Sequence, residues 1–216
     1  MKIALIGATG FVGFAILKEA LNRGHEITAI VRHPEKLQAQ DNLTVVKGDV
    51  MDTGKLSELF KGNDVVVSAY NAGWTNPDLY NEFLKGSQSI QEAVKKSGVK
   101  RYIVNGGAGS LYVALGVQLI DTPQFPEAFK PGAGAARDYL NILKKEKELD
   151  WTFVSPAIEM NPGTPHERRG TYRTGLDNPV FDVDNKSTIS VEDLAVAIID
   201  EAEHPKHIRV RFTVGY

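Results

Sequence analysis

The sequence predicts an α/β protein built on a doubly wound parallel sheet. Short runs of β-branched and other apolar residues alternate with helical patterns along most of the chain. Most of these runs are apolar almost throughout, as strands covered on both faces are. The length of 216 residues, with 42% hydrophobic and 24% charged residues, suits one globular domain of this class. A disordered chain, a collagen-like chain and a coiled coil fit that composition poorly.

The elements follow one another in strand and helix order. The predicted strands of the first part of the chain are Ile3–Ile6, Glu26–Val31, Leu43–Val46, Asp64–Ala69, Val99–Val104 and Trp151–Val154. The first predicted helix, Phe11–Arg23, carries an apolar stripe and ends at Gly24. A short helix lies around Leu56–Phe60, and a longer one is expected to start at the Asn76-Pro77 cap and stop at Gly98. Such alternation is typical of a doubly wound sheet.

A glycine-rich turn connects the first strand to the first helix. Gly7 permits the tight turn, Gly10 lets the backbone approach a pyrophosphate, and Gly13 lets the helix pack close to the strand. The pyrophosphate would lie on the free N–H groups at the helix start. The turn therefore predicts a Rossmann dinucleotide-binding fold, although a simple strand-turn-helix is the alternative. The expected cofactor-binding residues of this turn are Gly7, Thr9, Gly10, Phe11, Val12 and Gly13.

The end of the second strand determines which nicotinamide nucleotide is preferred. An acidic residue there would accept from the ribose of NAD(H), but this chain has Val31-Arg32-His33. Arg32 can hold a 2′-phosphate through two hydrogen bonds, so NADP(H) is predicted to be preferred over NAD(H). The alternative is that Arg32 stacks on the adenine and does not distinguish the two nucleotides.

The chain from Pro156 to Ser187 is rich in Pro, Gly, Asn and Arg and shows no clear periodicity. A capped helix, Val191–Ala202, and a last strand, Ile208–Val214, follow it. No second core could form from this part, so we expect a single domain over 1–216. Within it, 1–155 is the predicted cofactor-binding core and 156–216 a small substrate-side region with the closing helix and strand.

The spacing GATGFVG, GxxGxxG rather than GxGxxG, resembles the extended and atypical branches of the short-chain dehydrogenase/reductase superfamily. Further segments resemble its NAD(P)H-binding group, often called NADH-flavin reductase-like, whose relatives include NmrA-like proteins and biliverdin-IXβ/flavin reductases. These segments are VRHPEK, GDVMD, VVVSAYNAG, GGAGSL, DWTFVSPA, TYRTG and ISVEDLAVAIIDE with RFTVGY, so the resemblance covers the whole chain.

The resemblance implies further cofactor contacts. Asp49 with Val50 would touch the adenine, unless Asp49 is only a turn residue. Ser68, Ala69 and Tyr70 would lie along the nicotinamide ribose.

The loop after the fifth strand is expected to face the acceptor. Small residues would let a flat ring approach the nicotinamide, and Ser110, which matches the serine of the GGAGS pattern, would hold a substrate carbonyl or a water. The alternative is that Ser110 only satisfies the loop backbone. The apolar stretch Leu111–Ile120 would form a lid over the acceptor or a contact in a homodimer. The predicted substrate pocket is Gly106, Gly107, Ser110 and Pro156, with Ser110 as the one candidate catalytic residue.

No tyrosine has a lysine four residues later, the pair that usually passes a proton in this superfamily. Tyr139 lies in the expected helix, but Lys144 is five residues on. Hydride transfer to a flavin, a quinone or a similar flat acceptor does not need that pair. The sequence therefore predicts an NADPH-dependent oxidoreductase for such small molecules. The alternative is a non-catalytic NADP(H)-binding redox sensor of the NmrA-like type.

Other functions are not expected. A net charge of −2 argues against nucleic-acid binding. The absence of cysteine excludes thiolate chemistry, and the scattered histidines predict no metal site. No apolar run reaches the length of a membrane span, and the short apolar start reads as a strand rather than a signal peptide, so a cytoplasmic protein is expected.

Overall fold

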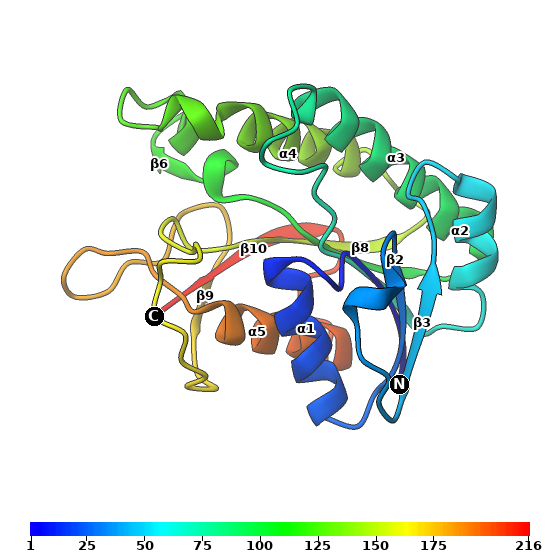
Figure 1. The fold of residues 1–216 in the computed structure, drawn as a ribbon. Helices are drawn as coiled ribbons and strands as arrows, with labels where there is room; N and C mark the ends of the chain where they lie inside the picture. Colours follow the sequence, from blue (N-terminus) through cyan, green and yellow to red (C-terminus); the bar gives the residue numbers. More distant parts are fainter.

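An eight-stranded sheet runs through the middle of the molecule in the order β3-β2-β1-β4-β5-β8-β10-β9 (Figure 1). The computed structural model describes all residues from 1 to 216. All neighbouring strands are parallel except β9, which runs antiparallel to β10. The strands are β1 (Lys2–Ile6), β2 (Glu26–Val31), β3 (Leu43–Lys47), β4 (Val65–Ser68), β5 (Arg101–Asn105), β8 (Asp150–Ser155), β9 (Arg173–Gly175) and β10 (Val210–Gly215). The predicted doubly wound sheet is confirmed.

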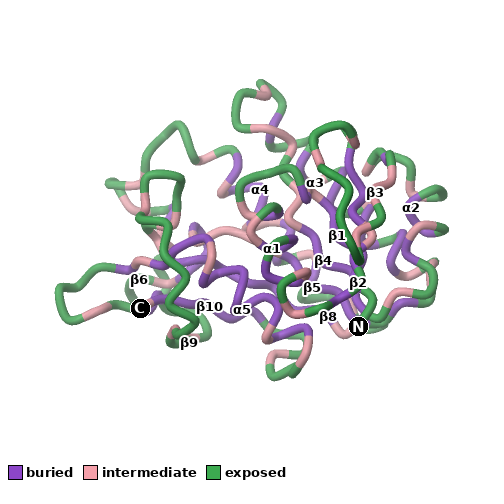
Figure 2. Tube along the Cα trace, turned by 60° about the horizontal axis from the view of Figure 1, so that its bottom comes forward, coloured by how far each residue is buried: buried purple, intermediate pink, exposed green.

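Helices cover both faces of the sheet (Figure 1). The helices α1 (Phe11–Asn22) and α5 (Val191–Glu203) lie on one face, and α2 (Thr53–Phe60), α3 (Leu79–Ser97) and α4 (Lys130–Leu143) lie on the other. Each face has its own hydrophobic core of more than twenty buried residues, so the central strands are buried on both sides (Figure 2). This explains why their sequences are apolar throughout.

The start of α3 differs from the prediction. The expected cap at Asn76-Pro77 is a turn that precedes the helix, because the Asn76 side chain accepts from the backbone N–H of Asp78 at 2.9 Å. Asp78 then occupies the capping position, and α3 begins at Leu79. The end at Gly98 is as predicted, with Gly98 in the left-handed region at φ 85°.

The two stretches without clear periodicity contain short strands. The segment after β5 forms a hairpin of β6 (Tyr112–Ala114) and β7 (Val117–Gln118), which turns at Gly116. The irregular part between Pro156 and Ser187 contributes β9 to the edge of the main sheet. The strands β6 and β7 are too short to show a period, and β9 pairs with β10, which is distant in sequence. Periodicity therefore could not reveal either pairing.

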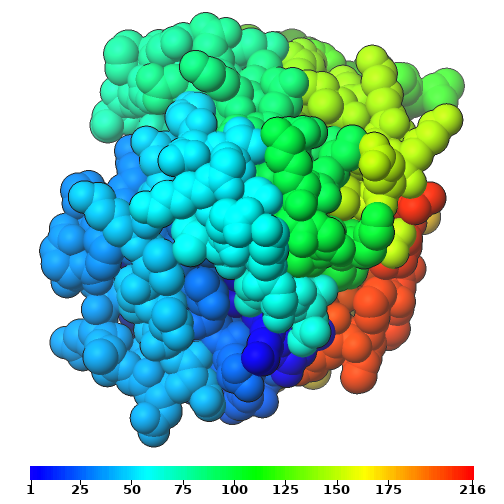
Figure 3. All heavy atoms as spheres, turned by 90° about the vertical axis from the view of Figure 1, so that its right-hand side faces the viewer, coloured from blue at the N-terminus to red at the C-terminus, as the bar shows by residue number.

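All parallel strands end at one edge of the sheet, and the loops that follow them gather there. Figure 3 shows the opposite edge, where the strands begin and the turns that lead into β4, β5, β8 and β10 lie side by side. In open α/β sheets, ligands bind outside the carboxyl ends of the strands. The candidate site is therefore the carboxyl edge.

Candidate functional site

A groove of about 630 Å³ follows the carboxyl ends of β1, β2, β3 and β4; we call it the β-edge groove. It joins the glycine turn to the loops after β2, β3 and β4, with the start of α3 on its rim. The glycine turn and the loops after β2, β3 and β4 are the segments predicted to hold the cofactor, whereas the start of α3 was not among them. The predicted residues that line the groove are Gly7, Thr9, Gly10, Arg32, Asp49, Val50, Ala69 and Tyr70.

Close packing requires glycine at two positions of the turn. Gly7 has φ +84°, and a Cβ there would lie 2.5 Å from the Ala69 carbonyl oxygen. A Cβ on Gly13 would lie 2.0 Å from the Gly7 carbonyl oxygen, so any side chain would push α1 away from the turn. Gly10 is different, because it is exposed and its nearest neighbour would be the Gly7 oxygen at 3.3 Å. Its missing side chain leaves the mouth of the β-edge groove open.

The start of α1 has no capping group of its own. Gly10 provides no side chain, and the first turn contains no acidic residue. By contrast, α5 is capped by Ser190, whose hydroxyl accepts from the N–H of Asp193 at 3.0 Å. The first N–H groups of a helix need acceptors, and they attract anions. The open start of α1 therefore fits the pyrophosphate of a dinucleotide.

The loop after β2 offers positive charge to the β-edge groove. Arg32 is exposed and makes no hydrogen bond or ion pair within the protein. Lys36 also lines the groove, whereas His33 lies 3.0 Å from Glu35 through its Nδ1 atom. An unpaired guanidinium in this position suits a phosphate group.

Asp49 and Val50, the residues predicted to touch the adenine, follow β3 and both line the β-edge groove. One carboxylate oxygen of Asp49 accepts from the Met51 N–H at 2.9 Å, so Asp49 does shape a turn. Its other oxygen makes no hydrogen bond in the protein, and Asp49 lines the groove, so both interpretations of Asp49 are compatible with the geometry. Val50 contributes the apolar wall beside it.

The residues after β4 lie in two environments. Ser68 is buried beneath Tyr102, while Ala69 lines the groove. The Tyr70 ring stacks on Phe83 at 5.8 Å between centroids, and its hydroxyl donates to the Glu82 carbonyl at 3.2 Å. Burial, and then the charge of Glu82, raise the pKa of Tyr70 to about 12. Tyr70 is therefore a neutral side chain packed on α3.

The predicted acceptor residues are more enclosed than the cofactor residues. A Cβ on Gly106 would lie 1.9 Å from the Phe153 ring, so this glycine makes room for a core side chain. A Cβ on Gly107 would lie 3.5 Å from the Ala136 Cβ, which is an ordinary contact distance. Pro156 is buried. Their contact with an acceptor stays a prediction.

Ser110 is buried with 2% of its surface exposed, and its hydroxyl accepts from Arg211 at 3.2 Å. Arg211 also donates to Asp177 through Nε at 3.0 Å and through Nη2. Sequence reasoning missed this group, because Asp177 lies in the region without periodicity and Arg211 lies in the closing strand, far in sequence from Ser110. Only the unusual arginine inside the apolar closing strand could have drawn attention to it.

Tyr139 is fully buried, and its hydroxyl lies 3.2 Å from that of Tyr102. Burial raises the pKa of Tyr139 well above its usual value, and the neighbouring tyrosine adds to this rise. No lysine contributes to this environment.

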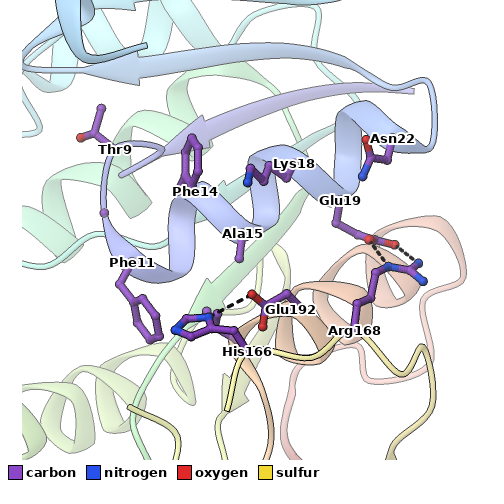
Figure 4. Close-up of a pocket in the computed structure, with 12 residues that line it drawn as sticks. Thr9, Phe11, Phe14, Ala15, Lys18, Glu19, Asn22, His166, Arg168 and Glu192 are labelled. Carbon is purple, nitrogen blue, oxygen red and sulfur yellow. Dashed lines mark hydrogen bonds and ion pairs between the residues drawn. The ribbon is translucent and has the colours of Figure 1, made fainter. Parts of the chain in front are cut away.

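A second groove of about 450 Å³, the α1 groove, runs along the outer face of α1 (Figure 4). Phe11 and Phe14 line it, and the Phe11 ring meets the His166 ring edge-on at 5.8 Å. Phe11 therefore points away from the β-edge groove, while Val12 packs against the core below α1. Thr9 and Gly10 border both grooves.

The arginines of the C-terminal region are held by the protein itself. Arg168 donates twice to Glu19 of α1, at 2.8 and 2.7 Å (Figure 4). Arg169 lies over the Tyr216 ring at 4.0 Å, and Arg173 donates to backbone carbonyls. These contacts fasten the region after β8 onto α1 and onto Tyr216 at the end of the chain.

The open helix start, the unpaired Arg32 and the groove between them match what a nicotinamide dinucleotide needs. A family profile described as NAD(P)H-binding matches residues 7–205. The chain belongs to this NAD(P)H-binding family. The match includes every loop of the β-edge groove and confirms the resemblance seen in the sequence motifs.

Several proteins from bacteria are similar to this chain over almost its whole length. The uncharacterised protein YwnB of Bacillus subtilis is 41% identical over 99% of this chain and 98% of its own. A structure from Bacteroides thetaiotaomicron, provisionally named an epimerase, is 50% identical with a TM-score of 0.92, covering 100% of this chain and 96% of that one. A Streptococcus pneumoniae structure, provisionally named an NADH-flavin reductase, is 37% identical with a TM-score of 0.88, covering 100% and 99%.

The NAD(P)H-binding family and these neighbours support an NAD(P)H oxidoreductase. No helix of the structure is both long enough and apolar enough to span a membrane. The cytoplasmic location, the homodimer and the division at residue 155 stay predictions.

Proposed function

We propose that the protein is an NADPH-dependent oxidoreductase that transfers hydride to a flavin, a quinone or a similar flat acceptor. The observation that carries the proposal is the β-edge groove, because an uncapped helix start and an unpaired Arg32 line the same cavity. The similarity to a protein named as an NADH-flavin reductase supports the acceptor class.

The residues of the groove would hold the cofactor in one orientation. The first N–H groups of α1 would bind the pyrophosphate, and Gly10 would keep the path clear of side chains. Arg32 would bind the 2′-phosphate, and the free oxygen of Asp49 would accept from the adenine amine. The nicotinamide end would then point toward β5 and β8, beyond the glycine turn. Bound NADPH supplies the hydride, and the protein contributes orientation and exclusion of water.

Tyr139 would take no part in proton transfer. Its hydroxyl is enclosed with Tyr102, and its raised pKa makes it a poor acid at neutral pH. A flavin needs no such donor, because the proton that accompanies hydride can come from water. The enclosed tyrosine therefore favours a flavin or quinone over an alcohol-forming reaction on a carbonyl.

One observation favours a second function, that of an NADP(H)-binding redox sensor. Ser110 and Pro156, predicted to face the acceptor, are buried. An enzyme needs an open path to the nicotinamide, whereas a sensor can have this path closed.

The deciding experiment mixes the purified protein with NADPH and a panel of flavins, quinones and biliverdin. Absorbance of the reduced nicotinamide reports turnover, and calorimetry reports NADPH binding. Oxidation that depends on an acceptor supports the enzyme, while tight binding without turnover supports the sensor. Failure to bind either NADPH or NADH would reject both.

A further inference from the structure

Two buried hydroxyls without partners lie at the carboxyl ends of β8 and β10. Ser155 and Thr213 are both completely buried, and neither side-chain oxygen has a hydrogen-bond partner in the protein. They are register partners on neighbouring parallel strands. Buried hydroxyls in native proteins are normally paired, because an unpaired one is costly. Two such groups side by side therefore point to a ligand that supplies the missing hydrogen bonds.

Both hydroxyls belong to the face of the sheet that carries α3 and α4, and the β6–β7 hairpin lies on this same side (Figure 1). Side chains alternate along a strand, so Ser155 shares a face with Phe153, and Thr213 shares one with Arg211. Phe153 and Arg211 are themselves register partners, and Phe153 packs in the core beneath α3 and α4. The Thr213 methyl group lies toward β9, 3.3 Å from where a Cβ of Gly175 would be.

Ser110 adds a third hydroxyl to this cluster through Arg211. Its oxygen accepts from Arg211 at 3.2 Å, and its own proton has no acceptor in the protein. A guanidinium only donates, so the Ser110 proton must be directed elsewhere. A hydroxyl that accepts from a charged donor is also a better donor itself.

The charge of Arg211 is balanced within the protein. Its Nε and Nη2 atoms both donate to one oxygen of Asp177. The cluster therefore offers neutral hydroxyls rather than a free positive charge. Such a surface matches a carbonyl or imide edge and gives no compensation for burying a carboxylate or phosphate.

The covering segments are fastened to Arg211 at one point. Asp177 accepts through its carbonyl from the N–H of Tyr112 at 2.8 Å, and Asn178 donates to the Tyr112 carbonyl at 2.7 Å. The hairpin beyond Tyr112 makes few other contacts, and Leu115 at its tip is fully exposed. The hairpin and residues 176–178 are therefore joined to each other, and Asp177 joins both to Arg211.

We propose that Ser110, Ser155 and Thr213 bind the carbonyl or imide edge of a neutral flat acceptor, and that the β6–β7 hairpin with residues 176–178 is the lid. This rests on the proposed oxidoreductase function, since the cluster lies beside the loops after β5 and β8 where the nicotinamide would end. It narrows the acceptor to neutral compounds. Flavins and quinones fit, whereas acceptors whose carboxylates must enter this cluster do not.

The test uses Ser155→Ala, Thr213→Val and the double variant, with riboflavin and menadione as neutral acceptors. Each lost hydrogen bond should raise the KM or Kd for the acceptor roughly five- to tenfold. NADPH affinity, measured separately by calorimetry, should be unchanged. The melting temperature should be equal or higher, because an unpaired buried hydroxyl has been removed. Ser87→Ala, which alters a buried serine on α3 that is 5% exposed, is the matched control and should change none of these values.

Hydrogen exchange gives a second measurement, with the NADP⁺ complex as the starting state. Amides of residues 112–118 should exchange more slowly once riboflavin is saturating, because the lid closes on it. The proposal is overturned if neither neutral acceptor binds the NADP⁺ complex, if the double variant binds them as the parent does, or if exchange in the hairpin is unaffected. Intact NADPH binding in any of these cases would leave the cofactor assignment standing.

Discussion

The two halves of the carboxyl edge are built in different ways. The half after β1 to β4 is an open groove with exposed Arg32 and an uncapped helix start. The half after β5, β8 and β10 is covered, and its polar groups are buried hydroxyls around a neutralised Arg211. An open surface with a free helix start and an unpaired arginine suits a ligand with several phosphates. A covered, neutral surface suits a ligand that must be kept from water.

The difference shows how one edge can separate binding from chemistry. In the proposed arrangement, the open half would supply affinity through charge-assisted hydrogen bonds to phosphate. The covered half would supply little affinity until the proposed lid moves. Substitutions in the open half should therefore change nucleotide binding, and those in the covered half should change acceptor use.

The largest effect is expected at Gly10. In Gly10→Val, a branched side chain would stand in the path of the pyrophosphate, so NADPH affinity should fall by at least about a hundredfold. The fold should survive, because φ at Gly10 is −86° and its Cβ position touches only the Gly7 oxygen at 3.3 Å. Calorimetry measures binding, and circular dichroism checks the fold.

Gly54→Val is the matched control for that variant. Gly54 is an exposed glycine at the start of α2, and its Cβ position lies 3.7 Å from the nearest atom, an oxygen of Asp52. It should bind NADPH as the parent does. Unchanged affinity in a folded Gly10→Val protein would mean that the open half does not hold the nucleotide.

A smaller effect is expected for Arg32→Ala. A hydrogen-bonded charge pair contributes about 1.5–3 kcal/mol, which corresponds to roughly ten- to a hundredfold in NADPH affinity. NADH affinity should hardly change, because NADH has no 2′-phosphate. Lys47→Ala, which removes an exposed charge outside the groove, is the control. Equal weakening of both nucleotides would identify Arg32 as a residue that stacks on adenine.

The open half was predictable from sequence to a greater extent than the covered half, and the reason is locality. The glycine turn is one continuous segment, and Arg32 and Asp49 each follow directly after a recognisable strand. The covered half joins Ser110, Ser155 and Thr213 with Asp177, which come from four separate segments. A single hydroxyl residue at a strand end carries no distinctive pattern. Only the register of β8 with β10 brings Ser155 and Thr213 together.

The structure also shows a purpose of Gly106 that sequence reasoning did not assign. A small residue after β5 was expected to admit a flat ligand, and the space is filled by the Phe153 ring. A glycine that makes room for a ligand and one that makes room for a core side chain look alike in a sequence. The distinction needs the packing of a residue almost fifty positions away.

Within the covered half, Ser110→Ala and Tyr139→Phe should differ. Ser110→Ala removes a hydroxyl of the predicted acceptor site and leaves an Arg211 N–H without its partner, so turnover should fall by more than a fewfold. Tyr139→Phe should keep turnover with a flavin within a fewfold of the parent, because its hydroxyl meets only Tyr102. Steady-state rates with riboflavin measure both. The reverse result would indicate a proton relay through Tyr139 and a carbonyl acceptor.

The smallest effect concerns pH and the same two tyrosines. Burial raises the pKa of both Tyr102 and Tyr139 above the value of about 10 that they have when the chain unfolds. Their contribution to stability is therefore complete below pH 10 and is lost as the pH rises above it, since only the unfolded chain then releases their protons. Each tyrosine should lower the free energy of unfolding by up to about 1.4 kcal/mol per pH unit in that range.

The double variant Tyr102→Phe/Tyr139→Phe removes both hydroxyls together and leaves neither unpaired, so its urea stability at pH 8 should stay near that of the parent. Its loss of stability between pH 10 and 11 should be clearly shallower. An equally steep loss would mean that the alkaline transition begins elsewhere, for example at Tyr172, whose pKa is raised by burial and by its hydrogen bond to Asp200.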